Sequence, residues 1–431
     1  MRKKISEFTL KLQNQNSVPL WALANDNVLF SAALNQNYPW KNKSYKISRL
    51  MKISNTLKVP GCLIFLIGFY KIVLSLEKIR KKKLRDKNTT VNYKKIFVGH
   101  GANAEEFIFE EYVKKNNSSA LRINVINLDG LEKITTPSLF LLLKLLFQNS
   151  YGLSHKIKKL SFDFNLNLLD FLVVAALNIG EYVFFSEFFR IAKLKGINEV
   201  TFLALHVSAH SCAREKLKMV YWSHGLIKLS ILMIKANHIA VLTLEEKNYL
   251  ISLFKGEVDC SLLKNYKPVL GIKKNSIIFM SPELLSMFPE AIKENVFSFL
   301  EWCKNVDFQI ILRPSPKTSQ SDLLDLKKQL PGYNNIDEFQ IDFEERLKTI
   351  QPKFVAGLNT TGLFVALSLE ILPICFCDPH VDDATWNMIY PMKQRALFWP
   401  KDRCIIEEAI CSDIAYNEHL LRLRNALDCD L

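Results

Sequence analysis

The chain has 431 residues, of which 49% are hydrophobic, and its formal net charge is +14. This length suits two domains of ordinary size, and the apolar content excludes a wholly disordered chain. Residues 1–100 hold 20 of the 57 Lys and Arg residues but only 4 of the 43 acidic residues, so the rest of the chain is close to neutral. A nucleic-acid-binding fold would spread its basic residues more widely. We therefore expect no nucleic-acid partner, since only the basic segment argues for one.

That basic segment joins an apolar run to a cluster of cations. Residues 59–76 contain a single charged side chain, Lys71, and EKIRKKKLRDK at 77–87 follows with seven cations. The run is marginal for a bilayer span, but it suits a helix that lies in the cytoplasmic leaflet beside anionic lipids. The alternative is a core helix followed by a solvated charged face. We predict a membrane-associating arm over 1–90, with anionic lipids contacted through 59–87.

From residue 94 onward, short apolar runs alternate with longer helical patterns, which is typical of βαβ units and parallel sheets. The first group of expected strands is 94–101, 121–130, 156–164, 198–206 and the start of 238–254. The second group is 275–281, 307–317, 352–362 and 373–378. The predicted fold class is therefore α/β with two Rossmann-like parallel-sheet domains. Their predicted bounds are 91–255 for the first domain, 256–274 for a linker, 275–400 for the second domain and 401–431 for a helical tail.

Ligands of open parallel sheets bind at the carboxyl ends of the strands, and two turns of the second domain carry polar residues there. NTTG supplies Asn359, Thr360, Thr361 and Gly362 at a helix start, where hydroxyls cap N–H groups and hold phosphate. A simple helix cap is the alternative explanation of this turn.

The other turn, RPSPK, brackets Ser315 with Arg313 and Lys317, two cations able to hold a charged leaving group. A rigid loop with two solvated cations explains it equally well.

Two turns of the first domain offer proton acceptors. SHG contains His224, whose residue type titrates near neutral pH, and GHGANAEE contains His100 and Glu106. A turn histidine bonded to backbone and ordinary helix-start acids are the alternatives. His206 and His210 have helical spacing beside Cys212, but without a further ligand we expect no metal site. Nine cysteines without framework spacing indicate a reduced, cytoplasmic protein.

These turns resemble those of GT-B-fold glycosyltransferases that build bacterial surface polysaccharides. The nearest likeness is to sialyltransferases and polysialyltransferases, and to the glycerol-phosphate polymerases of teichoic acid synthesis. IILRPSPK resembles the strand that ends in their His–Pro motif, and FVAGLNTTGLFVAL resembles their phosphate-holding strand, Ser/Thr pair and helix. YWSHGLIK is similar to the His–Gly stretch of the polymerases. The likeness covers residues 94–400, and such enzymes use a basic arm to reach lipid-linked acceptors.

The chain departs from that family at three places. Ser315 stands where the sialyltransferases have the His of His–Pro, and the nearest string to their acidic motif is LDG at 128–130. Many GT-B enzymes hold the donor ribose with a Glu at the position of Ala366, whereas Glu370 comes one turn later. A cytidine-activated donor is therefore only the first expectation.

The resemblance implies a metal-independent glycosyltransferase without a cofactor. Its donor would be a nucleotide-sugar, in first place a CMP-linked, sialic-acid-like one, and its acceptor a surface polysaccharide such as lipopolysaccharide or capsule, or a lipid-linked glycan. The second domain would hold the donor and the first the acceptor, with His224, or alternatively His100 or Glu106, as the base. The expected location is cytoplasmic, peripheral on the inner face of the cell membrane. The alternatives are a CDP-activated glycerol- or ribitol-phosphate transferase and a catalytically inert membrane-associated assembly protein of the same fold.

Overall fold

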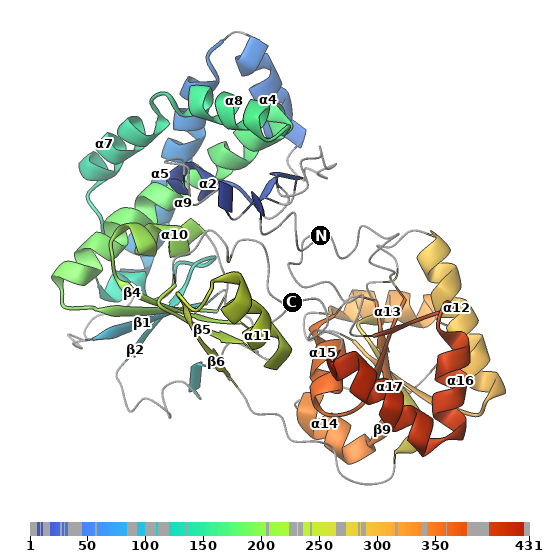
Figure 1. Cartoon of the computed structure of the whole chain (residues 1–431). Coiled ribbons are helices and arrows are strands. Elements are labelled where there is room, and N and C mark those ends of the chain that lie inside the picture. Colours follow the sequence, from blue (N-terminus) through green and yellow to red (C-terminus); the bar gives the residue numbers. More distant parts are fainter. Residues whose placement is uncertain are drawn as a thin grey trace. The chain divides into compact units, whose positions relative to one another are not determined.

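The chain divides into two compact units, residues 1–240 with 253–261 and residues 241–252 with 262–431. Figure 1 shows the computed structural model of the protein. It describes residues 7–8, 10–11, 18–25, 28–29, 31–32, 45–56, 58–83, 93–99, 109–110, 120–134, 136–203, 207–223, 231, 236–241, 244–263, 273–282, 285, 290–314, 318–330, 332–333, 335–337, 343–358, 360–376 and 396–425.

The first unit is built on a sheet in the order β2-β1-β3-β4-β5-β6. Its strands are β1 (Lys95–Gly99), β2 (Ala120–Asn124), β3 (Glu199–Phe202), β4 (Lys218–Trp222), β5 (His238–Val241) and β6 (Asp259–Leu262). The pairs from β2 through β5 are parallel. Buried parallel strands are short apolar runs, as in β1, where Ile96, Phe97 and Val98 are buried. At the start of β3, Glu199 pairs with Lys95 at 2.9 Å and Lys218 at 2.8 Å, so one carboxylate joins three strands.

A layer of helices lies on one side of this sheet (Figure 1). The described helices of the first unit are α2 (Val18–Trp21), α4 (Tyr45–Thr56), α5 (Pro60–Lys83), the short 3-10 helix η1 (Leu131–Lys133), α7 (Leu139–Ser150), α8 (Leu153–Asp163), α9 (Leu168–Leu194) and α10 (Val207–Arg214). Helix α11 (Leu244–Leu253) belongs almost wholly to the second unit. Asn167 caps α9 by accepting from the N–H groups of Leu169 and Asp170 at 3.1 and 3.3 Å. Within the described residues α9 alone is long and apolar enough to cross a bilayer, and 67% of that apolar window is buried in the protein.

Helix α5, the centre of the predicted arm, packs against α9. A Cβ atom on Gly180 would lie 2.7 Å from the carbonyl oxygen of Gly68, so only glycine allows the two backbones to approach this closely. Lys71 points inward and donates a hydrogen bond to the carbonyl of Leu177, and burial lowers the pKa of its ammonium group. The arm predicted over 1–90 therefore includes a helix that forms part of the first unit.

The predicted strand at 156–164 is wrong, because this segment lies in helix α8. The short string KIKKLSFDF alternates between polar and apolar residues, which favours a strand. The buried positions are Leu153, Ile157, Leu160, Ser161 and Phe164, and their spacing follows the helical period of 3.6 residues. The helical period becomes visible only when the flanking Leu153 is included.

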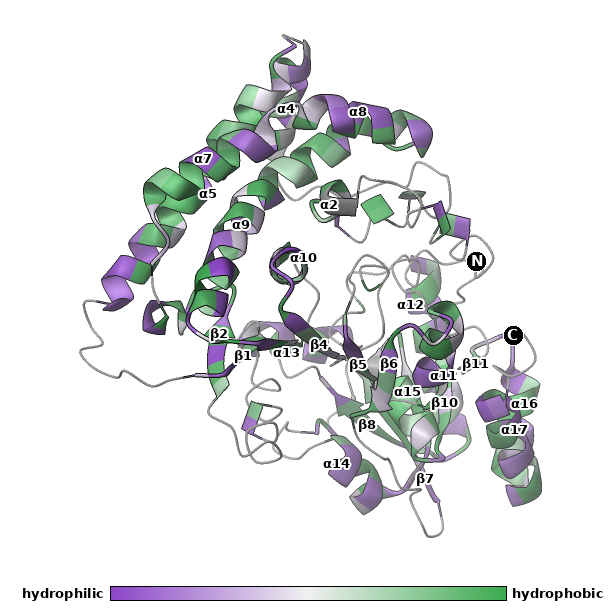
Figure 2. Cartoon of the chain, turned by 60° about the vertical axis from the view of Figure 1, so that its left-hand side comes forward, coloured by the Kyte–Doolittle hydropathy of each residue, from purple (hydrophilic) through white to green (hydrophobic). Residues whose placement is uncertain are grey.

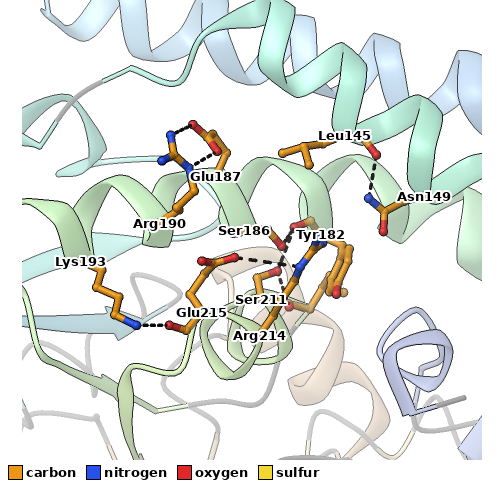
Figure 3. Close-up of polar contacts among 11 residues, drawn as sticks. Leu145, Asn149, Tyr182, Ser186, Glu187, Arg190, Lys193, Ser211, Arg214 and Glu215 are labelled. Carbon is orange, nitrogen blue, oxygen red and sulfur yellow. Dashed lines mark hydrogen bonds and ion pairs between the residues drawn. The ribbon is translucent and has the colours of Figure 1, made fainter. Parts of the chain in front are cut away.

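Polar contacts join α9 to α10, which follows β3 (Figure 3). The hydroxyls of Ser186 and Ser211 both donate to the carbonyl oxygen of Tyr182, at 2.7 and 2.9 Å. At the ends of the two helices, Lys193 donates to the carbonyl of Glu215 at 2.9 Å. These bonds fix α10 on the layer, and desolvation raises the pKa of the Glu215 carboxyl there.

The second unit is built on a sheet in the order β11-β10-β9-β7-β8, with parallel pairing throughout. Its strands are β7 (Lys274–Met280), β8 (Gln309–Arg313), β9 (Pro352–Gly357), β10 (Leu372–Cys375) and β11 (Leu397–Phe398). Its further helices are α12 (Glu290–Asn305), α13 (Gln320–Gln329), α14 (Phe343–Ile350), α15 (Thr361–Ser368), α16 (Arg403–Cys411) and α17 (Asp413–Asn425). The predicted fold class, two α/β units each built on a parallel sheet, is confirmed.

The predicted linker contains a strand, and the predicted tail contains two helices. Strand β6 lies inside the predicted linker 256–274, because Asp259–Leu262 adds an edge strand to the first sheet. The predicted tail at 401–431 begins with α16 and α17, which pack on the second unit. The Tyr416 hydroxyl donates to the carbonyl of Lys353 at 2.9 Å and accepts from the N–H of Leu372 at 3.0 Å, which ties α17 to β9 and β10.

Candidate phosphate-binding site

The candidate site lies at the carboxyl edge of the second sheet. The register places the last residues of four strands side by side, with Met280 opposite both Arg313 and Gly357, and Gly357 opposite Cys375. From β7 the chain continues to β8 on one side, and β9 lies on the other, so β7 and β9 flank the topological switch point. Ligands of open parallel sheets bind at such a point, and the turn from β9 to α15 begins there.

That turn is a tightly packed strand-to-helix connection. Thr360 has extended backbone angles and caps α15, its hydroxyl oxygen accepting from the N–H of Gly362 at 3.3 Å. A Cβ atom on Gly362 would lie 2.8 Å from the end of the Met280 side chain, and one on Gly357 would lie 2.9 Å from Thr360. The turn thus has little room for a side chain at Gly357, whereas at Gly362 the flexible end of Met280 would have to move. The first turn of α15 lies at the positive end of the helix dipole, which favours phosphate.

Arg313 lies at this edge, but its guanidinium group is fully buried. It donates to the carboxylate of Asp337, and its Cζ lies 5.3 Å from the ring centre of Phe343. The other carboxylate oxygen of Asp337 lies 3.0 Å from Nε of Arg346. The Arg313 guanidinium is therefore paired with Asp337 and lies over the ring of Phe343 in the interior of the second unit.

Arg313 contacts the first turn of α15 indirectly, through the ring of Phe343. The ring of Phe343 lies 3.4 Å from the position of a Cβ on Gly362, so it packs against the first turn of α15. Backbone hydrogen bonds hold the segment containing Asp337 on β8. The N–H of Asp337 donates to the carbonyl oxygen of Leu312, and the N–H of Leu312 donates to the carbonyl oxygen of Asn335, both at 2.8 Å. Neither Asp337 nor Phe343 lies in a local sequence motif, so neither was among the predicted site residues.

The remaining predicted residues lie outside what the structure describes. These are His100, Glu106, His224, Ser315, Lys317, Asn359 and the side chain of Thr361. Their positions in the chain are nevertheless informative. His100 directly follows Gly99 at the end of β1, which is one of the two strands at the switch point of the first sheet. His224 follows Ser223, whose N–H donates to the carbonyl of Ala240 at 2.8 Å just beyond β4.

Other acid–base groups in the first unit are ion-paired or desolvated. Asp129, the carboxylate of the LDG string, is ion-paired with Lys82 of α5. Burial lowers the pKa of His210 to about 4 and raises the pKa of the Cys212 thiol, so both are neutral at physiological pH. Among the described residues no cluster of three or more His, Cys, Asp or Glu side chains could hold a metal ion.

The structure also contains a Ser–His–Asp constellation that the sequence analysis missed. Nδ1 of His238 on β5 lies 2.6 Å from the carboxylate of Asp259, and Nε2 lies 2.8 Å from the hydroxyl of Ser261, both on β6. In hydrolases that use such a triad the Asp is buried, whereas the Asp259 side chain is 75% exposed. The contacts pin the edge strand β6 to β5.

Comparisons with known proteins give a distant structural likeness. No protein-family model matches the chain, and no curated protein matches it significantly. A UDP-GlcNAc 2-epimerase of Methanocaldococcus jannaschii, in complex with UDP-GlcNAc and UDP, has a TM-score of 0.37 and 12% identity, covering 65% of this chain and 82% of its own. A glycosyltransferase from Rickettsia africae has a TM-score of 0.37 and 11% identity, and the match covers 78% of this chain and 94% of that one. MurG from Acinetobacter baumannii has a TM-score of 0.40 and 9% identity, covering 78% and 96%. At these values the likeness assigns neither a substrate nor a mechanism to this chain.

Proposed function

We propose that the protein is a glycosyltransferase that moves a sugar from a nucleotide-activated donor to a glycan acceptor. The observation that carries this proposal is the Thr360-capped start of α15 at the switch point of the second sheet. A hydroxyl cap at the positive end of a helix dipole suits a phosphate. The donor phosphate binds next to Thr360, Thr361 and Gly362, with Asn359 at the entrance of the turn.

Negative charge develops on the nucleotide phosphate as its bond to the sugar breaks. The N–H groups at the start of α15 stabilise this charge, and they act without reorganisation because the turn is already packed. Lys317 adds a positive charge and Ser315 a hydroxyl from the turn after β8. Arg313 acts as a positioning residue through Phe343. With these groups in place, transfer requires no metal ion or cofactor.

The acceptor hydroxyl must lose a proton as its oxygen attacks the anomeric carbon. His224 is the proposed base, because imidazole titrates near neutral pH and this residue follows the end of β4. His100, after β1, and Glu106 are the alternatives.

The proposed donor is CMP-linked and sialic-acid-like, on the strength of the sequence resemblance. The proposed acceptor is a surface polysaccharide such as lipopolysaccharide or capsule, or a lipid-linked glycan, at the cytoplasmic face of the membrane, where residues 59–87 contact anionic lipids. A CDP-activated glycerol- or ribitol-phosphate transferase would use the same phosphate site, but would leave phosphate in the product.

A catalytically inert assembly protein is the second candidate, and one observation favours it. Many GT-B enzymes carry a ribose-binding Glu at the position of Ala366, which is fully buried here. Glu370, one turn later, pairs with Arg424 of α17 at 2.6 Å and so holds the last helix in place. Neither residue is placed to hold a ribose.

The test is a thermal-shift screen of the full chain against CMP, CDP, UDP, GDP and ADP. Bound ligand at a hundredfold excess over its dissociation constant stabilises a protein by about 2.7 kcal/mol, so one nucleotide should raise the melting temperature clearly. Thr360→Ala should abolish this shift, and by losing the cap it should itself cost only about 1 kcal/mol of stability. Thr360→Ser keeps the hydroxyl oxygen and should keep the shift.

Two outcomes would contradict the proposed site. If no nucleotide shifts the folded wild-type protein, the inert candidate replaces the enzyme. If a nucleotide shifts the wild type and Thr360→Ala equally, the protein binds nucleotides elsewhere.

A further inference from the structure

Helix α5 presents an apolar stripe to solvent on the side away from its buried face. The buried residues Ile64, Gly68 and Ile72 recur every four positions on one side. On another side Leu66, Tyr70 and Val73 are 58%, 63% and 37% exposed. A surface helix normally exposes polar residues on its outer face, so this outer stripe needs another explanation.

Helix α7 continues the same apolar surface. Phe140, Phe147 and Tyr151 are 75%, 63% and 80% exposed and follow one another at helical spacing along and just beyond the helix. Phe147 contacts Phe65 of α5 edge to face, with 6.4 Å between the ring centres, and lies 6.3 Å from Tyr151. The two helices run side by side as largely apolar ribbons (Figure 2). Together these exposed side chains form one surface, the α5–α7 face, consisting of Leu66, Tyr70, Val73, Phe140, Phe147 and Tyr151.

Cations border the α5–α7 face. Lys78, Arg80, Lys81 and Lys83 are exposed on the last turns of α5, beyond the apolar stripe, and the end of that helix is strongly hydrophilic in Figure 2. The next helix after α7, α8, exposes Lys156, Lys158 and Lys159. An apolar patch edged by cations complements an anionic bilayer, whose acyl region takes the aromatic rings while its head groups attract the cations.

The contacts of α5 with α9 favour a position on the bilayer surface over a span across it. Its glycine contact with α9 and the hydrogen bond from Lys71 to Leu177 hold one side of the helix against protein. Only the opposite side is available to lipid, so the helix cannot be surrounded by acyl chains.

We propose that the α5–α7 face docks the protein on an anionic membrane surface, with Tyr70, Phe140, Phe147 and Tyr151 entering the head-group boundary. The proposal rests on the membrane location proposed above, but is independent of the phosphate site and of any transfer chemistry. It adds α7, which lies outside the basic segment, to the lipid contacts of 59–87.

The test is flotation of the full chain with vesicles of phosphatidylcholine alone or mixed with phosphatidylglycerol. The wild type should bind the mixed vesicles, and more weakly as salt is raised. The variant Tyr70→Ser/Phe140→Ser/Phe147→Ser should bind at least about tenfold more weakly, because three exposed aromatic anchors are lost. Lys78→Gln/Lys81→Gln should also bind about tenfold more weakly, and its binding should depend less on salt.

Ile414→Ser/Leu421→Ser is the matched control, since these α17 residues are 73% and 58% exposed on the other unit. It should bind vesicles as the wild type does. All variants should keep the nucleotide-induced thermal shift, so failure of docking is distinguishable from failure of the proposed function. Unchanged vesicle binding by the aromatic variant would overturn the proposal. Failure of the wild type to bind anionic vesicles would also overturn it. The same holds if the wild type does not bind vesicles and sedimentation shows that the α5–α7 face joins two copies of the chain.

Discussion

Replacement of Gly180 by leucine should lower the free energy of unfolding of the first unit by about 3 kcal/mol or more, at the upper end of the usual cost of overpacking. A Cβ atom at this position would lie 2.7 Å from the backbone oxygen of Gly68 and 3.0 Å from Cβ of Lys71. Backbone atoms cannot yield as a flexible side chain does, so α5 and α9 must separate. Circular dichroism melting of the full chain would measure the loss.

Gly61→Ala is the matched control on the same helix. A Cβ there would have as its nearest contact the Ser154 hydroxyl, at 3.7 Å, which is an ordinary van der Waals distance. This variant should melt at or slightly above the wild-type temperature, because alanine favours helix over glycine. A wild-type melting temperature in Gly180→Leu would show that α5 is not packed on α9, as expected of a separate membrane arm.

Removal of the Asp337 carboxylate should be the most damaging single change in the second unit. Asp337→Ala leaves the fully buried guanidinium of Arg313 without its carboxylate partner. Breaking a buried ion pair from one side costs about 3–5 kcal/mol. Chemical denaturation of the variant and the wild type would measure the difference. Asp325→Ala is the control, since Asp325 and Lys328 form an exposed pair at 3.1 Å, and loss of such a pair costs at most about 1 kcal/mol.

A double variant separates the cost of a stranded charge from the value of the pair. Arg313→Met/Asp337→Leu removes both charges from the interior and should recover most of the stability that Asp337→Ala loses, because a buried pair is often replaceable by apolar residues. Arg346 remains, and its side chain is 27% exposed, so it can turn to solvent. If the double variant is no more stable than Asp337→Ala, the ion pair itself contributes to the stability of the unit, beyond keeping each buried charge neutralised.

The sequence predicted the two parallel sheets because each buried strand is a short apolar run between helical patterns. It missed β6, because the four residues Asp259–Leu262 lie within a polar stretch that favours a linker. The sequence pattern placed the Thr360 turn between a strand and a helix, as the structure has it, while the phosphate role of this turn stays a prediction.

Contacts between distant parts of the chain were beyond sequence reasoning. The burial of Arg313 depends on Asp337 and Phe343, which come from a later segment and a later helix. Likewise the apolar run at 59–76 predicted a membrane arm. Nothing in that run indicates that Gly68 contacts Gly180 of α9, so its packing in the first unit could not be foreseen. A single sequence shows that a glycine is present, but not which backbone it approaches.

Hydrogen–deuterium exchange of the full chain, with and without the nucleotide that gives the largest thermal shift, tests the donor site most directly. We expect slower exchange in peptides that cover the end of β9 and the first turns of α15, residues 354–368, with little change at α16 and α17. Protection confined to the first unit would contradict the placement of the donor phosphate at Thr360.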